Sequence, residues 1–255
     1  MLAAMDSQGR VIFAILLREA RVRHGRSHLG YGWAVIEPVA LILFLTLVFS
    51  QLRSSGISGY DFALFFATGV LPFNLFRTSS QYASGALEAN RPLFHYPPVQ
   101  PVDAVLARVL LESATALLVM GLVFGAQIAW LRAPPPAHPL QLLAVLGLAA
   151  TLAFGVAMCL ATAREWLPSL GHLYGVLMGP AFLLSGIFFS LHAMPEGARD
   201  MLVWNPLIHI VEGFRSGYLA GYRAPELDLA YLAWFAGGSV VLGLALTLTF
   251  GRKAS

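Results

Sequence analysis

Long runs of apolar residues alternate with short polar connections along this 255-residue chain. A helix that crosses a membrane needs roughly 20 predominantly apolar residues, and six runs come close to or exceed that length. They cover residues 34–51, 62–80, 103–131, 140–163, 169–191 and 229–250. No connection between them has room for a second folded domain. We therefore predict one membrane domain over residues 1–255.

The composition agrees with this pattern. Hydrophobic residues make up 58% of the chain and charged residues only 11%, whereas an average soluble domain has roughly 25% charged residues. So few charges cannot cover a water-soluble particle of this size, and we predict an all-α integral membrane protein with six transmembrane helices. The net charge of +3 does not indicate nucleic-acid binding, because the basic residues flank apolar runs, where they contact membrane lipids.

The basic residues also predict the orientation. If the N-terminus is inside, the inner flanks carry Arg10, Arg18, Arg21, Arg23, Arg26, Arg77, Arg91, Arg108, Arg164, Arg252 and Lys253. The outer flanks carry Arg53, Arg132, Arg199, Arg215 and Arg223. Since Lys and Arg are more frequent on the cytoplasmic side, both termini are expected in the cytoplasm.

The segment ahead of the first span, within residues 1–32, changes character midway. Residues 11–17 are apolar, and the following residues up to Arg26 are rich in arginine. Such a helix can lie along the inner membrane surface with its arginines among the headgroups. A basic flank without a further role is an equally open interpretation.

The first span carries a carboxylate and a proline about one turn from its start. Ionisable residues at that depth usually face a cavity or a protein partner, so Glu37 is expected at a protein-lined or water-lined position. The alternative is local pairing with Arg26 or with another arginine of the flank. Tyr31 and Trp33 fit an interfacial aromatic belt, and they could instead form a platform for an apolar sugar face.

Three glycines of the fifth span recur every four residues. Gly171, Gly175 and Gly179 occupy one face of the predicted helix. This spacing lets another helix backbone approach closely, and the partner helix could belong to this chain or to a second copy.

Two connections have unusual sequences. In residues 81–102, Glu88, Asn90 and Arg91 precede a proline-rich stretch, and a rigid element of mixed polarity suits docking to a soluble protein. In residues 192–228, apolar residues recur at helical spacing, and they are Leu207, Val211, Phe214 and Tyr218. His209, Glu212 and Arg215 form a polar stripe on the same helix. This helix could pack partly into the membrane or form a short amphipathic cap.

Signatures of catalysis are missing from the sequence. There is no G-x-x-x-x-G-K-[ST] phosphate loop and no H-E-x-x-H motif. His172, His192 and His209 are too dispersed to predict a metal site, and the single Cys159 excludes an intramolecular disulfide. We therefore predict no catalytic residue and no metal ligand.

Three stretches together resemble the permease subunit of ABC-2 type exporters, specifically the capsular polysaccharide export branch. They are "LLREARVRHGRSHLGYGWAVIEP", "LEANRPLFHYPPVQPVDAVLARVLLE" and "WNPLIHIVEGFRSGY". The order of all three is more specific than any one of them, and the resemblance covers nearly the whole chain.

The resemblance implies a homodimer in the bacterial inner membrane, each copy pairing with a separate ATP-binding subunit. ATP and Mg would then be bound by the partner, and no cofactor by this chain. It also implies that a cytoplasmic coupling helix between spans two and three transmits the ATPase motion. The coupling residues would be Glu88, Asn90, Arg91, Leu93 and Tyr96.

For the cargo, the resemblance implies a lipid-linked polysaccharide. Tyr31, Trp33 and Glu37 would border its path at the cytoplasmic face. Short outer helices in residues 192–228 would form the exit, with His209, Glu212 and Arg215 at an outer gate. A periplasmic polysaccharide co-polymerase would continue the route.

The predicted function is therefore that of a transport permease without enzymatic activity of its own. The same architecture could export O-antigen, teichoic acid or a small lipophilic compound. A membrane-embedded glycan transferase would need a convergent acid/base or metal constellation, which the sequence lacks. A secondary transporter would favour two similar halves, and spans one to three do not resemble spans four to six.

Overall fold

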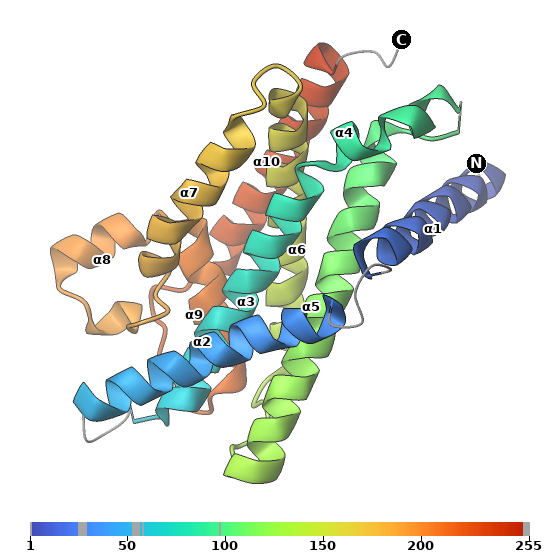
Figure 1. The fold of residues 1–255 in the computed structure, drawn as a ribbon. Helices are drawn as coiled ribbons and strands as arrows, with labels where there is room; N and C mark the ends of the chain where they lie inside the picture. Colours follow the sequence, from blue (N-terminus) through green and yellow to red (C-terminus); the bar gives the residue numbers. More distant parts are fainter. Residues whose placement is uncertain (1, 25–29, 53–56, 58, 97, 252–255) are drawn as a thin grey trace.

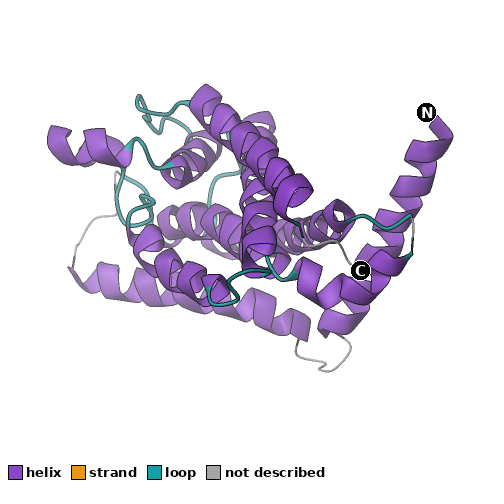
Figure 2. Ribbon diagram, turned by 90° about the horizontal axis from the view of Figure 1, so that it is seen from above, coloured by secondary structure: helices purple, strands orange, loops and turns teal. Residues whose placement is uncertain are grey.

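The chain forms a bundle of helices, shown from the side in Figure 1 and from above in Figure 2. This computed structural model describes residues 2–24, 30–52, 57, 59–96 and 98–251. Its helices are α1 Leu2–His24, α2 Gly30–Leu52, α3 Phe62–Ala83, α4 Ala86–Asn90, η1 Arg91–His95, α5 Pro101–Leu131, α6 Pro139–Arg164, α7 Leu170–Leu183, η2 Leu191–Ala193, α8 Glu196–Leu202, α9 Pro206–Tyr218 and α10 Leu229–Phe250. Over the described ranges, extended pairing is limited to one isolated bridge between Ile57 and Tyr60. The all-α prediction is confirmed.

Within the described ranges, four helices are long and apolar enough to cross a membrane. They are Gly32–Leu52, Pro101–Leu131, Pro139–Arg164 and Leu229–Phe250, close to four of the six predicted spans. The second predicted span forms α3, which carries Asn74, Arg77 and Gln81 in its second half. The chain is thus a multi-pass membrane protein with several apolar helices.

The fifth predicted span is corrected by the structure. A continuous helix was expected over residues 169–191, but α7 ends at Leu183 after 14 residues. Gly186 then adopts a positive φ of 77°, which is compatible with a turn and not with a helix. Backbone outside a helix is tolerated inside a membrane bundle only where protein groups satisfy it, and a buried arginine described below does so.

Helix α9 continues along the bundle below α7 and reaches the end where α5 and α6 are joined (Figure 1). The amides of Ala137 and His138 in that connection donate to the carbonyls of Tyr218 and Gly217 at the end of α9, at 3.1 and 2.7 Å. The outer segment 192–228 is thus partly embedded in the bundle and is not only a surface cap.

The core of the bundle lies around α3 and α6. Helix α3 packs against α2, α5, α6 and α9, and α6 packs against α3, α5, α9 and α10. Phe65, Phe66 and Phe73 of α3 are almost completely buried. In α6, Ala153 and Ala157 are fully buried. These two helices therefore form the centre against which the other elements pack.

Helices α6 and α10 approach each other through glycines that the sequence pattern did not single out. A Cβ atom added to Gly155 would lie 2.6 Å from the backbone of Val240, and one added to Gly243 would lie 2.9 Å from the carbonyl of Gly155. Backbones this close leave no room for a side chain between them, as in other small-residue contacts of membrane helices.

The three predicted packing glycines behave differently. A Cβ atom on Gly171 would lie 2.9 Å from the guanidinium of Arg164, one on Gly175 would lie 3.5 Å from Gln81, and one on Gly179 would meet nothing within 4 Å. Within the described chain, none of the nearest atoms within 4 Å of these positions belongs to the backbone of another helix. Close helix packing at these glycines stays a prediction, and its partner would be a second copy.

We predict that Gly155→Ala destabilises the protein, because its Cβ atom would overlap the backbone of Ser239 and Val240. Overpacking of this kind costs about 1–3 kcal/mol. The matched control is Gly147→Ala on the same helix, where a Cβ atom meets nothing within 4 Å. Thermal midpoints of the purified variants measure the difference, and equal midpoints would contradict the close α6–α10 contact.

Candidate functional site

Helix α1 is held against the bundle by the carboxylate of Glu19, which is only 4% exposed. Arg108 of α5 binds this carboxylate through two nitrogens, at 3.1 and 3.2 Å. Tyr82 of α3 donates its hydroxyl at 3.0 Å, and Asn90 at the end of α4 donates its amide at 2.9 Å. The amide oxygen of Asn90 in turn accepts from Arg18 of α1 at 2.6 Å. Four helices therefore meet at one anion.

The charge of Glu19 is stabilised by these partners. Burial would raise the pKa of this carboxyl, but the hydrogen bonds from Asn90, Arg108 and Tyr82 and the positive charge of Arg108 outweigh burial, so that the pKa is lowered. Glu19 is thus a carboxylate at neutral pH. Removing one member of such a buried pair would leave the other charged and uncompensated, which costs about 3–5 kcal/mol.

Beside this cluster, the predicted coupling residues lie in α4, in η1 and directly after it. Glu88, Arg91 and Tyr96 are exposed and Leu93 is half-buried, whereas Asn90 is fully buried in the Glu19 cluster. A pocket with about 600 Å³ of empty space separates this element from the end of α6. Its charged lining residues are Glu88, Arg91, Arg164 and Glu165. The short helices of residues 81–102 thus present a mixed-charge surface to the outside.

Arg164, the last residue of α6, contacts this surface. Its guanidinium donates to the hydroxyl of Ser84 at 2.9 Å and lies 3.8 Å from the carboxylate of Glu88. The Glu88 side chain is 85% exposed, so this ion pair contributes little to stability. Glu88 is therefore a surface charge that can be changed without disturbing the core.

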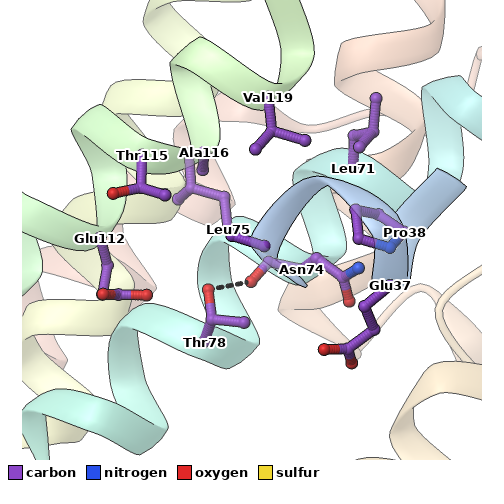
Figure 3. A pocket seen from close by; sticks show the side chains of 11 residues that line it. Glu37, Pro38, Leu71, Asn74, Leu75, Thr78, Glu112, Thr115, Ala116 and Val119 are labelled. Atoms are coloured by element: carbon purple, nitrogen blue, oxygen red, sulfur yellow. Dashed lines mark hydrogen bonds between the residues drawn. The ribbon is translucent and has the colours of Figure 1, made fainter. Parts of the chain in front are cut away.

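A second polar site lies between α2, α3 and α5, in a pocket with about 570 Å³ of empty space (Figure 3). Polar residues from all three helices line it, and they are Glu37 of α2, Asn74 and Thr78 of α3, and Glu112 and Thr115 of α5. Both hydroxyls donate to carbonyls one turn back in their own helices, at 2.7 and 2.9 Å. Pro38 of α2 also lines the pocket and has no N–H, so the carbonyl of Ala34 at the same pocket receives no helical hydrogen bond.

Glu37 therefore lies at a protein-lined pocket. Glu112 comes from the middle of a long apolar helix and is only 3% exposed, and ionisable residues at such positions commonly line transport pathways or bind one another. Trp33 is 64% exposed one turn before Glu37. Arg26, the alternative partner of Glu37, and the side chain of Tyr31 lie outside the described part of the structure.

The predicted outer gate contains a completely buried arginine. The guanidinium of Arg215 donates to the carbonyls of Gly186, Ile187 and Phe189 at 2.5, 2.8 and 3.0 Å. Its carbon atom lies 3.7 Å from the centre of the Phe65 ring, a cation–π contact. Arg215 therefore binds the non-helical backbone that follows α7 and joins it to α3.

Glu212 completes this cluster from the same helix. Its carboxylate lies 3.4 Å from Arg215 and accepts the hydroxyl of Tyr222 at 2.9 and 3.0 Å. It also accepts the amide of Leu191 at 3.4 Å. The Tyr222 hydroxyl lies 2.8 Å from that of Ser190, so residues 186–191 are held from two sides.

His209, the third predicted gate residue, forms its hydrogen bonds with backbone groups. Its Nε2 donates to the carbonyl of Val203 at 2.8 Å, and its Nδ1 accepts the amide of Asp228 at 3.2 Å. His209, Glu212 and Arg215 are all at most 2% exposed. The structure places them inside the chain, where they hold its connections together.

Sequence reasoning missed several polar residues that the fold brings together. Glu112 and Asn74 could have been found as polar residues within apolar runs. Glu19 and Arg108 lie 89 residues apart, and no spacing rule links them. Within the described ranges, no group of three His, Cys, Asp or Glu side chains could hold a metal ion.

Comparison with known proteins identifies the class. The family described as "ABC-2 type transporter" matches residues 10–219. The chain therefore belongs to the ABC-2 type transporter family, and it is a transport permease whose ATPase lies on a separate subunit.

The chain is also similar to individual proteins over nearly the full length of both sequences. The chain is 33% identical over 249 residues to the polysialic acid transport protein KpsM of Escherichia coli, covering 97% of this chain and 96% of the relative. It is 29% identical to the capsule polysaccharide export inner-membrane protein BexB of Haemophilus influenzae, covering 96% and 92%. It is 25% identical to the O-antigen export system permease protein RfbA of Myxococcus xanthus, covering 95% and 92%.

Acid should release α1 from the bundle. Because the pKa of Glu19 is below its ordinary value of 4.5 in the folded chain, its stabilisation is fully present above that value and is lost as the pH falls through the lowered folded value. Glu19→Gln should mimic this at neutral pH, with a loss of about 3 kcal/mol. Proteolysis within α1 as a function of pH measures the release.

The matched control is Glu196→Gln, an exposed glutamate of α8. In this control, α1 should still be bound at neutral pH and released by acid. In Glu19→Gln, α1 should already be released at neutral pH, so that acid has no further effect. If both variants behave like the natural chain at neutral pH, Glu19 does not hold α1.

Arg215→Lys should destabilise the segment after α7 even though the charge is kept. Lysine is a point charge with three donors and cannot reproduce the planar fork that reaches three carbonyls. We expect a loss of about 3 kcal/mol and faster proteolysis within residues 184–190. Arg91→Lys on the surface is the control. An unchanged thermal midpoint for Arg215→Lys would show that the guanidinium geometry is not required.

Proposed function

We propose that this protein is the membrane permease of an ATP-driven exporter that moves a lipid-linked capsular polysaccharide across the bacterial inner membrane. The observation that carries the proposal is the similarity to KpsM and BexB, which extends over more than nine-tenths of both chains in each comparison. Their printed functions are polysialic acid transport and capsule polysaccharide export. A bundle of apolar helices with polar groups at membrane depth supports the same function.

The chain crosses the membrane six times in this proposal. Four crossings are the long apolar helices, and α3 is the fifth. The sixth is made by α7 and α9 in succession, since α7 alone has 14 residues and α9 continues along the bundle. Both termini are cytoplasmic, with α1, α4 and the end of α10 on the cytoplasmic side, in accord with the positive-inside rule.

The surface of Glu88, Arg91, Leu93 and Tyr96 receives the ATP-binding subunit, which binds ATP and Mg. This surface lies next to the Glu19 cluster, in which Asn90 at the end of α4 is hydrogen-bonded to α1. A displacement of α4 by the partner is therefore passed to α1 and α5 through buried polar contacts. Packed elements of this kind move as rigid pieces.

The polymer passes along α2. A second copy of the chain covers the exposed side chains of α2 and α7, among them Phe44, Leu47 and Val176, and the path lies at the seam of the homodimer. Trp33, Tyr31 and Glu37 border it near the cytoplasmic face. The polar pocket of Glu37, Asn74 and Glu112 supplies hydrogen-bonding groups suited to sugar hydroxyls. A periplasmic co-polymerase receives the polymer on the far side.

A second candidate cargo is O-antigen, which the 25% identity to RfbA supports. Both cargoes are long sugar polymers, and the higher identities to KpsM and BexB favour capsular polysaccharide. A complementation assay distinguishes them. The gene is expressed with its ATP-binding partner in a strain that lacks its capsule-export permease and in a strain that lacks its O-antigen permease, and polymer at the cell surface is measured. Restoration of O-antigen alone, or of neither polymer, would contradict the capsule proposal.

Charge reversal at the docking surface should abolish export and preserve folding. We predict that Glu88→Arg lowers surface polysaccharide by at least about tenfold, equivalent to roughly 1.4 kcal/mol of lost coupling, at an unchanged level of membrane protein. The control is Glu196→Arg, an equally exposed glutamate in α8. Normal export by Glu88→Arg would refute docking at this surface.

A further inference from the structure

Two adjoining pockets lie along the second half of α5, and α2 lines the first of them. The first is an apolar groove with about 920 Å³ of empty space. Ile42 and Leu43 of α2 face Leu122, Ala126 and Trp130 of α5 across it. Its wall is almost entirely hydrocarbon, with one exception at its end.

The exception is Gln127, which lines both this groove and the second pocket. Gln127 is only 6% exposed, and its Nε2 donates to the carbonyl of Ala63 at 3.2 Å. Its Oε1 is buried and has no hydrogen-bond partner in the described part of the chain. A buried acceptor without a partner costs about 1–3 kcal/mol, so this oxygen points to a donor that is supplied by a ligand.

The second pocket has about 810 Å³ of empty space and carries charges of both signs. Arg132 lies at the end of α5, and Asp61 lies at the start of α3. Asp61 uses one carboxylate oxygen to cap α3 by accepting the amide of Ala63 at 2.8 Å. Among the described residues, neither Arg132 nor Asp61 forms an ion pair with another side chain. A cation and a carboxylate are thus both available to one ligand.

We propose that the two pockets together bind one zwitterionic glycerophospholipid with a primary ammonium headgroup. An acyl chain fills the α2–α5 groove, and the phosphate binds Arg132. The ammonium binds Asp61 and donates a hydrogen bond to Oε1 of Gln127. The site is independent of the exported cargo, and the lipid fills the space between α2 and α5.

Other occupants fit this pair of pockets less well. A phosphatidylcholine headgroup has no N–H to donate to Gln127, and an anionic headgroup provides no cation for Asp61. A second copy of the chain could fill the groove with apolar side chains, but apolar side chains offer no partner to Arg132 or Asp61, and burying these charges unpaired is costly. The charge pattern therefore selects the ethanolamine class.

The test is lipid retention by the purified full-length protein, measured by native mass spectrometry. Phosphatidylethanolamine, phosphatidylglycerol and phosphatidylcholine with identical acyl chains are titrated separately. We expect phosphatidylethanolamine to bind about three- to fivefold more tightly than the other two, as one partly exposed ion pair provides. Equal or stronger binding of phosphatidylglycerol, or no retained lipid, would overturn the proposal without the use of any variant.

Two conservative variants locate the headgroup. Asp61→Asn keeps a good helix cap and should remove the preference for phosphatidylethanolamine while improving the binding of phosphatidylglycerol. Arg132→Asn tolerates the positive φ of 52° at this position and should weaken both lipids. Asp200→Asn and Arg223→Asn are the matched controls at exposed positions elsewhere. Unchanged lipid selectivity in Asp61→Asn would overturn the assignment, because a merely structural role predicts no change in selectivity.

A third variant locates the acyl chain. Ala126→Phe fills the groove and should weaken every lipid equally, whereas Ala129→Phe, which lies outside the groove on the same helix, should not. A Leu122→Cys variant in a Cys159→Ser background tests for a second copy. Disulfide cross-linking between copies at this position would show that the groove is a dimer interface and would overturn the lipid proposal.

Discussion

A buried guanidinium makes the break between α7 and η2 possible. The carbonyls of Gly186, Ile187 and Phe189 lie outside the regular helices, so they need other donors inside the bundle. Arg215 supplies three donors to these carbonyls and rests on the ring of Phe65. Its charge is compensated by Glu212, which is itself bonded to Tyr222 and to the backbone of Leu191. The path of the chain from α7 through α8 to α9 depends on this one cluster, because unsatisfied backbone groups are not tolerated at membrane depth.

The other end of the bundle also has a buried charged side chain that is surrounded by hydrogen-bond partners, but there the central group is an anion. There a buried carboxylate, Glu19, collects donors from α3, α4 and α5 and fixes α1. Both clusters join segments that are distant in sequence, and both are charge-assisted, so their geometry is more specific than that of the surrounding apolar packing. The two polar clusters thus fix the positions of α1 and of the segment after α7, which apolar packing alone would hold less specifically.

The sequence predicted the parts of the fold that depend on local properties. The length of an apolar run is such a property, and α2, α5, α6 and α10 lie where the runs lie. The early end of α7 depends on Arg215, which lies 26 to 29 residues beyond the carbonyls that it binds, and no local pattern reveals that pairing. His209, Glu212 and Arg215 were correctly recognised as a polar stripe, yet a stripe does not show whether it faces an opening or the interior. Asn90 was expected at the partner surface with Glu88, and only the position of α1 reveals that it points inward.

The glycine contact between α6 and α10 has a mechanical consequence. Where two backbones touch without side chains between them, there are no rotamers that can adjust to a new crossing angle, and the pair has a single arrangement. Helices α6 and α10 thus form a fixed frame for the subunit. Helix α2, by contrast, has Pro38 within it and contacts α3 through side chains, among them the ring of Phe49 against that of Phe66. We therefore expect conformational change during a transport cycle to be concentrated on the α2 side of the subunit, and the α6–α10 pair provides the reference against which that movement can be measured.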